Sequence, residues 1–109
     1  TKWGLIGLTK TWALELGPHK VRVNALCPAS VEGERIEAVM ARDADERGVS
    51  VGDIRESYER QSSLKSFTRV EDIASMVCYL ASDAAVRISG QAIGLDGHTE
   101  TLGNSLGAL

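Results

Sequence analysis

This 109-residue sequence has only two cysteines and two histidines, and they are spread along the chain. Cys27 and Cys78 each lie inside an apolar run, with no second Cys or His at a ligand spacing. This pattern argues against a metal site and a disulfide framework, and it favours a reducing, cytoplasmic setting. His98 has no partner nearby in the sequence, so we expect it at the surface rather than in catalysis. Lys2, taken alone, is most simply a solvated lysine in the first turn of a helix.

One segment, Pro28 to Gly33, is suited to close approach of its backbone by another group. It follows Val21–Cys27, a β-branched and apolar run typical of a strand buried on both faces in a parallel sheet. The segment itself is small or turn-forming, and Ser30 and Gly33 leave space beside the backbone. The same composition suits an ordinary turn between a strand and a helix, so the residues alone leave both interpretations open.

The first predicted helix starts at the beginning of the sequence and ends at the Gly17-Pro18 break. Its apolar residues recur every three or four positions, at Leu5, Leu8, Trp12 and Leu16. The helical pattern is present from the first residue, without a methionine or a capping box. We therefore expect this chain to be part of a longer one.

Three more helices and a second strand are predicted downstream. Residues 35–47 and about 51–61 predict two charge-rich helices, and Thr68-Arg69-Val70-Glu71 predicts a capping box at the start of a third. In that box the Thr68 hydroxyl accepts from the Glu71 amide, and the Glu71 side chain accepts from the Thr68 amide. Residues 91–95 predict the second strand, followed by a turn. The expected inward side chains are Ile36, Val39 and Met40, then Ile54 and Tyr58, then Ile73, Val77, Leu80 and Ala81 with Met76 at the margin.

The predicted order is helix, strand, helix, helix, helix, strand, which is typical of an α/β protein with a parallel sheet. Two parallel strands make a poor sheet by themselves, because each needs neighbours and cover on both faces. We expect the missing neighbours to come from an absent part of the chain or from another copy.

The composition excludes several classes of function. With 43% apolar and 25% charged residues the chain reads as globular, and a net charge of −3 offers no electrostatic basis for binding nucleic acid or an anionic membrane. The apolar runs are far shorter than the roughly 20 residues that a membrane-spanning helix needs.

Several motifs, in their order along the chain, resemble the C-terminal half of a short-chain dehydrogenase/reductase. The resemblance extends from Thr1 to about His98 and implies the C-terminal part of a Rossmann-like, doubly wound parallel sheet within a single domain. It also implies that residues 32–66 form a substrate loop or lid and that residues 99–109 form a loose tail. The motifs are Thr1–Lys10, Leu14–Leu16, Val21–Pro28, Glu71–Ala74, Leu80–Asp83, Ile88–Gln91 and Asp96-Gly97.

The resemblance implies roles for individual residues. Lys2 matches the lysine of the family's catalytic Tyr-x-x-x-Lys pair, whose tyrosine would lie four residues earlier, beyond the start of this sequence. An adjacent ammonium group lowers the pKa of such a phenol, and it can also hold the nicotinamide ribose. The resemblance further implies that the backbone of Pro28, Ala29, Ser30 and Val31 contacts the nicotinamide carboxamide. This sequence has Ala29 where glycine is usual and Gly33 where a cofactor-contacting threonine is common.

The implied activity is hydride transfer between NAD or NADP and an alcohol or carbonyl substrate, including 3-oxoacyl compounds, in a homodimer or homotetramer. The substrate loop would contribute Glu32, Gly33, Ile36 and Met40. The charges of that loop also fit the solvated faces of two amphipathic helices. The alternative function is a non-catalytic assembly piece, because the family's glycine-rich cofactor loop, serine and tyrosine do not occur in these 109 residues.

Overall fold

The computed structural model describes residues 2–99, which fall into two compact units. Of the described residues, unit 1 comprises 2–27 and 71–94, and unit 2 comprises 28–70 and 95–99. The elements are α1 (Lys2–Leu16), η1 (Gly17–His19), β1 (Ala25–Pro28), α2 (Glu34–Arg47), α3 (Val51–Glu59), α4 (Val70–Ala81), η2 (Asp83–Ala85) and β2 (Ala92–Leu95). The predicted order of elements is confirmed.

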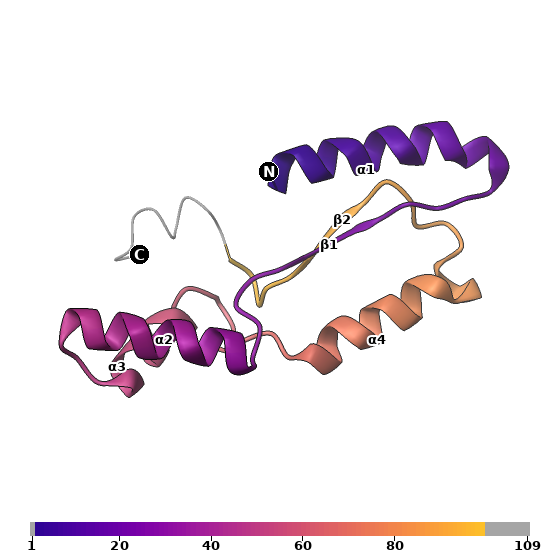
Figure 1. Cartoon of the computed structure of the whole chain (residues 1–109). Helices are drawn as coiled ribbons and strands as arrows, with labels where there is room; N and C mark the ends of the chain where they lie inside the picture. Colours follow the sequence, from indigo (N-terminus) through magenta and orange to yellow (C-terminus); the bar gives the residue numbers. More distant parts are fainter. Residues whose placement is uncertain (1, 100–109) are drawn as a thin grey trace. The chain divides into compact units, whose positions relative to one another are not determined.

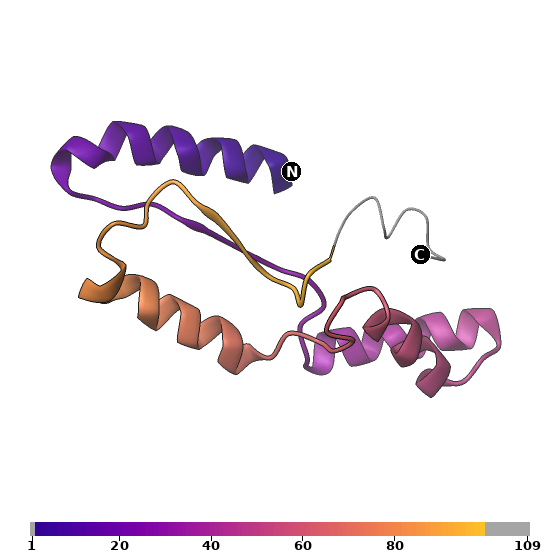
Figure 2. The same cartoon turned by 180° about the vertical axis from the view of Figure 1, so that it is seen from behind.

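Unit 1 is a layered arrangement of helices around a pair of strands. β1 and β2 pair in parallel, and the amide of Ala25 donates to the carbonyl of Gln91 at 2.9 Å where they begin to run together. Helix α1 lies on one side of the strand pair and α4 on the other (Figures 1 and 2). This is the α/β, Rossmann-like architecture that the sequence predicts.

The first strand is shorter than predicted, because side chains replace part of its ladder. Residues 21–24 run beside the chain that leads into β2, but they are not in the strand. The amide of Val23 donates to Ser89 Oγ at 3.1 Å, and the side-chain oxygen of Asn24 accepts from the amide of Gln91 at 3.1 Å. These bonds use groups that a regular ladder would pair with backbone, so β1 begins only after them.

The apolar faces of the helices in unit 1 are not buried, contrary to the prediction for α4. No residue of α4 is buried, and Val77 is 51% exposed. The stripe of α1 is similarly open, from 37% exposure at Leu16 to 63% at Leu5. The spacing correctly predicts both helices, but periodicity does not show whether a covering surface is present.

Unit 2 has a closed hydrophobic core between α2 and α3. Met40 is 1% exposed, and it clusters with Ala44, Ile54 and Phe67, while Ile36 and Tyr58 pack against the cluster. The predicted inward position of Val39 is wrong, since this side chain is 38% exposed. Met40 and Ala44 are four residues apart and share one helical face, which turns the neighbouring residue 39 away.

The residue types at the ends of α2 and α3 explain where these helices end and begin. Gly48 adopts φ 67° at the C-terminus of α2, in the left-handed region that glycine tolerates. Ser50 caps α3, because its hydroxyl accepts a hydrogen bond from the amide of Asp53 at 3.1 Å.

Candidate functional site

The proposed cofactor segment begins at Pro28, the last residue of β1, and lies in unit 2. Pro28 and Ala29 are exposed, whereas Ser30 and Val31 are half-buried. Val31 forms an isolated parallel bridge with Thr68. Thr68 is 8% exposed and lies two residues before the start of α4. The segment is therefore extended backbone supported by a second chain segment, and not a free turn.

Thr68 holds this segment through its backbone on both sides of Val31. Its amide donates to the carbonyl of Ser30 at 2.9 Å, and its carbonyl accepts from the amide of Glu32 at 2.7 Å. Its hydroxyl donates a hydrogen bond to the carbonyl of Leu95, the last residue of β2. One residue thus joins the segment after β1 to the end of β2.

The predicted capping box around Thr68 takes a different form. The Thr68 amide, which the box assigns to the Glu71 side chain, donates to the carbonyl of Ser30. The helix behind it, α4, begins at Val70 as the motif predicts. The motif around Thr68 correctly predicts the start of a helix. It does not predict the hydrogen bonds of Thr68 to Ser30 and Leu95, because these residues are far from Thr68 in the sequence.

Gly33, at the entrance to α2, has a backbone conformation that glycine alone adopts readily. Its φ is 151°, and a Cβ there would meet no atom within 4 Å. Backbone strain, not lack of space, therefore disfavours a side chain at this position. The threonine common in relatives would need a different path of the backbone into α2.

Glu32 is bonded to Arg55 of α3, an interaction that the sequence analysis does not predict. The guanidinium group of Arg55 approaches the Glu32 carboxylate to 2.5 Å, and its carbon lies 4.6 Å from the centre of the Phe67 ring. The hydrogen bond with Glu32 is the main cause that raises the pKa of Arg55 above its ordinary value, which keeps the cation charged. Only the spacing of Arg55 and Glu59, four residues apart, hints at this cluster in the sequence.

Two residues predicted for the substrate loop lie in or against the core of unit 2. Met40 is nearly inaccessible at 1% exposure, and Ile36 is partly buried against the same cluster. Glu32 and Gly33 lie at the entrance to α2, where Glu32 is half-buried and Gly33 is exposed. Met40 and Ile36 therefore form part of the interior of the loop, whereas Glu32 and Gly33 lie nearer to its surface.

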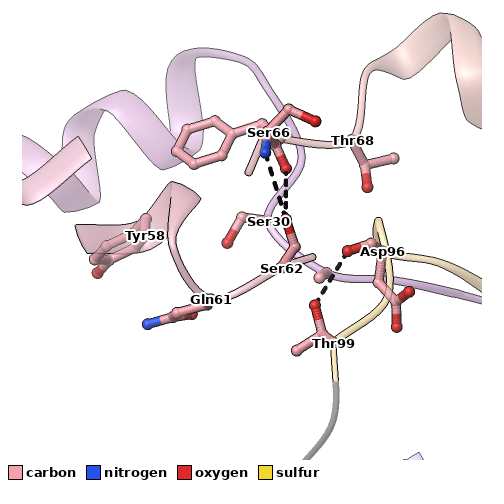
Figure 3. Close-up of a pocket in the computed structure, with 10 residues that line it drawn as sticks. Ser30, Tyr58, Gln61, Ser62, Ser66, Thr68, Asp96 and Thr99 are labelled. Carbon is pink, nitrogen blue, oxygen red and sulfur yellow. Dashed lines mark hydrogen bonds between the residues drawn. The ribbon is translucent and has the colours of Figure 1, made fainter. Parts of the chain in front are cut away.

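A small polar cavity lies beside Ser30 in unit 2 (Figure 3). Its volume of about 30 Å³ is enough for one water molecule and far too small for a nicotinamide ring. Hydroxyl groups surround it, and the Ser62 hydroxyl bonds to both the carbonyl and the amide of Ser66 at 3.3 and 3.4 Å. The lining residues are Ala29, Ser30, Tyr58, Gln61, Ser62, Ser66, Phe67, Thr68, Asp96 and Thr99.

His98 is exposed, as predicted, and it links two loops of unit 2. Its ring nitrogen Nδ1 and the Ser63 hydroxyl form a short hydrogen bond, and its amide donates to the Asp96 carboxylate at 2.9 Å. Its φ of 68° lies in the left-handed region, which glycine adopts more readily than histidine.

The catalytic prediction for Lys2 concerns a side chain outside the described part of the structure. The backbone of Lys2 is the first residue of α1, and it belongs to unit 1. Thr1 and residues 100–109, which include all but the first residue of the predicted tail, also lie outside the described residues.

A parallel strand pair between helices, with an extended segment beyond the carboxyl end of β1, defines an α/β protein of Rossmann type. A family model described as enoyl-(acyl carrier protein) reductase matches residues 1–98. The chain belongs to this family of short-chain dehydrogenases/reductases.

Individual relatives agree with this assignment. D-beta-hydroxybutyrate dehydrogenase of Rhizobium meliloti is 38% identical over 88% of this chain and 38% of its own length. The 3-oxoacyl-[acyl-carrier-protein] reductase FabG of Thermotoga maritima is 35% identical over 89% of this chain and 35% of its own length. This chain thus spans little more than a third of each of these relatives.

Solved structures match the fold closely. A short-chain dehydrogenase family protein from Francisella tularensis superposes with a TM-score of 0.83 at 28% identity, over 88% of this chain and 40% of that one. The F189W actinorhodin polyketide ketoreductase with NADPH superposes with a TM-score of 0.78 at 29% identity, over 88% of this chain and 37% of that one.

The described residues lack two further features. Within residues 2–99, no three His, Cys, Asp or Glu side chains gather in a way that could hold a metal ion. Nor does that part of the chain contain a helix with the length and apolar character needed to cross a membrane.

Proposed function

We propose that the protein is an NAD(P)-dependent oxidoreductase that transfers a hydride between a nicotinamide and a carbon carrying an alcohol or carbonyl oxygen. The observation that carries the proposal is the family match over residues 1–98. We include 3-oxoacyl compounds among its substrates, because one similar protein is named a 3-oxoacyl-[acyl-carrier-protein] reductase.

The backbone around Val31 fits the carboxamide of a nicotinamide. The Ser30 carbonyl and the Glu32 amide are both bonded to Thr68. In a parallel bridge the N–H and C=O of the residue between them point to the opposite side, so those of Val31 point away from Thr68. A carboxamide has an acceptor oxygen and a donor nitrogen side by side, and it can pair with both groups. When bound, the nicotinamide supplies or accepts the hydride.

Lys2 supplies the ammonium group of the family's Tyr-x-x-x-Lys pair in this proposal. A positive charge beside a phenol favours the phenolate and lowers its pKa towards neutrality, where it can exchange a proton with the substrate oxygen. The same ammonium donates hydrogen bonds to the ribose hydroxyls of the dinucleotide.

Residues 32–66 act as a lid that excludes water from the reacting carbon. Glu32 and Gly33 lie at the entrance to α2, where they can face a substrate. Ile36 and Met40 contribute from inside, because the core that they help to form fixes the shape of the lid.

Titration and a matched pair of lysine variants test the proposal. The protein to test is one that carries this chain together with the family's upstream cofactor loop, serine and tyrosine, because the 109 residues alone are expected to be inactive. It should bind NADH or NADPH with saturation, and titration with each shows which one it prefers. Lys2→Ala should reduce turnover about 100-fold or more, the usual range for loss of an acid–base group. Lys10→Ala is the control, since Lys10 lies on the same helix and bonds to the Gly90 carbonyl at 2.8 Å. Equal turnover in the two variants contradicts the role of Lys2.

A second candidate is a non-catalytic piece that acts in assembly. The exposed apolar side chains of α1 favour it, with Trp3 at 80% and Leu14 at 81% exposure. Light scattering separates this candidate from the first, because an assembly piece forms oligomers without binding dinucleotide. A stable monomer contradicts it.

A further inference from the structure

We propose that Thr68 is a positioning residue whose hydroxyl holds the backbone of Val31 in the orientation that a nicotinamide carboxamide requires. The inference rests on the proposed function, and it adds to it a residue that need not touch the cofactor. The hydrogen bonds between Thr68 and the proposed cofactor segment come from the Thr68 backbone, whereas its hydroxyl bonds to Leu95, which lies outside that segment.

The first step is the support of the cofactor segment from one side. Thr68 bonds to the Ser30 carbonyl at 2.9 Å and to the Glu32 amide at 2.7 Å, one residue before and one after Val31. With both neighbours fixed, the direction of the Val31 N–H and C=O follows from the extended backbone. A shift of Thr68 therefore rotates the two groups that pair with the carboxamide.

The second step is the support of Thr68 itself. A single isolated bridge is a weak ladder, because it lacks the neighbouring bonds that make strand pairing cooperative. The hydroxyl supplies the missing connection, since it donates to the carbonyl of Leu95 at the end of β2. Two heavy atoms on its Cβ leave threonine few side-chain conformations, so this bond fixes the backbone as well.

The third step is the burial that makes the hydroxyl bond specific. Thr68 is 8% exposed, and the preceding Phe67 is 7% exposed in the core of unit 2. Removing the hydroxyl breaks the direct bond between Thr68 and the Leu95 carbonyl. A water molecule in the small cavity that Thr68 also lines could bond to that carbonyl, but it is not attached to the chain and so would not hold Thr68 in place. Thr68 then becomes more mobile, and Ser30 and Glu32 become more mobile with it because they are bonded to its backbone.

Two substitutions at Thr68 and one control test the inference. Thr68→Val keeps the shape and removes the hydroxyl, whereas Thr68→Ser keeps the hydroxyl. The control is Thr9→Val, because Thr9 is 9% exposed and its hydroxyl also donates to a backbone carbonyl, that of Leu5 at 2.7 Å. The readouts on the purified protein are the Kd for NADH and NADPH, the exchange rate of the Glu32 amide hydrogen, and the melting temperature.

We expect Thr68→Val to weaken dinucleotide binding about tenfold, which corresponds to about 1.4 kcal/mol, and to speed exchange at Glu32 by a similar factor. Thr68→Ser should restore both values. Thr9→Val should lower the melting temperature and leave both the Kd for the dinucleotide and the exchange rate at Glu32 unchanged. A role limited to capping α4 would speed exchange in the first turn of α4 and leave Glu32 unchanged, which overturns the inference.

The two proposals fail in different ways. If the wild-type protein binds a dinucleotide and Thr68→Val binds it equally well, the positioning role is wrong and the proposed function stands. If the wild-type protein binds neither dinucleotide, the proposed function is wrong. The exchange rate of the Glu32 amide then tests by itself whether the Thr68 hydroxyl holds the segment. Faster exchange in Thr68→Val, restored to the normal rate in Thr68→Ser, supports this role. An unchanged rate in Thr68→Val contradicts it.

Discussion

The two units of the chain differ in how well they bury their own apolar residues. In unit 2, Met40, Ile54 and Phe67 are between 1% and 7% exposed and contact one another in one cluster. In unit 1, the helical faces of α1 and α4 are open, with Leu5 at 63% and Val77 at 51% exposure. Both units contain amphipathic helices, so the difference lies in whether the complementary surface is within the same unit. Amphipathic spacing predicts a helix and its apolar face, but it does not identify what covers that face.

The largest expected effect tests the core of unit 2. Met40→Ala should destabilise unit 2 by about 2–5 kcal/mol, because it removes a buried side chain and leaves a cavity. Leu14→Ala in α1, at a position that is 81% exposed, is the matched control and should change stability by less than about 0.5 kcal/mol. Urea unfolding, followed by amide exchange within α2 and α1, measures both effects. Equal losses would mean that the contrast in burial does not govern stability.

A second comparison substitutes one glycine in each unit. Gly97→Ala should destabilise unit 2 by about 1–3 kcal/mol, since φ is 64° and the added Cβ would lie 3.3 Å from Ser62 Oγ. Gly7→Ala should stabilise α1 by about 0.5–1 kcal/mol, because that glycine is helical and a Cβ there meets nothing within 4 Å. A lower melting temperature for Gly97→Ala and a higher one for Gly7→Ala would support the description of both sites. A stabilising Gly97→Ala would contradict it.

The smallest expected effect asks whether charge also helps to close unit 2. Arg55→Met keeps an apolar stem and removes the guanidinium group, so it should cost about 0.5–1.5 kcal/mol from the Glu32 pair and the Phe67 contact. The loss should shrink at high salt, because both partners of the ion pair are partly exposed, at 36% and 41%. Arg47→Met is the control, since Arg47 is 67% exposed where it pairs with Asp43. A larger effect at Arg47 would contradict the proposed contribution of Arg55.

The parts of the fold that depend on neighbouring residues are predictable from the sequence. The cap at Ser50, the break after α1 and the face shared by Ile54 and Tyr58 each follow from residues within one or two turns. The start of β1 could not be predicted in the same way. It depends on side-chain bonds such as that from Asn24 to the Gln91 amide, which join residues 67 positions apart.

The candidate site divides in the same manner. Pro28–Val31 follows a strand and is recognisable from its composition, whereas the roles of Thr68 and Arg55 arise only when distant segments meet. The bond from Thr68 to Leu95 spans 27 residues, and that from Arg55 to Glu32 spans 23. No sequence motif or helical period links residues at these separations. The two contacts therefore could not be predicted from the sequence alone.

The cluster of Met40, Ala44, Ile54 and Phe67 has a consequence for how this segment can change over evolutionary time. All four residues come from one continuous stretch of the chain, so the interior of α2 and α3 is specified without help from α1 or α4. Substitutions on the outer surfaces of α2 and α3 can then accumulate with little cost to folding. The outer surface of this stretch can therefore change in sequence while its own interior keeps the fold of α2 and α3.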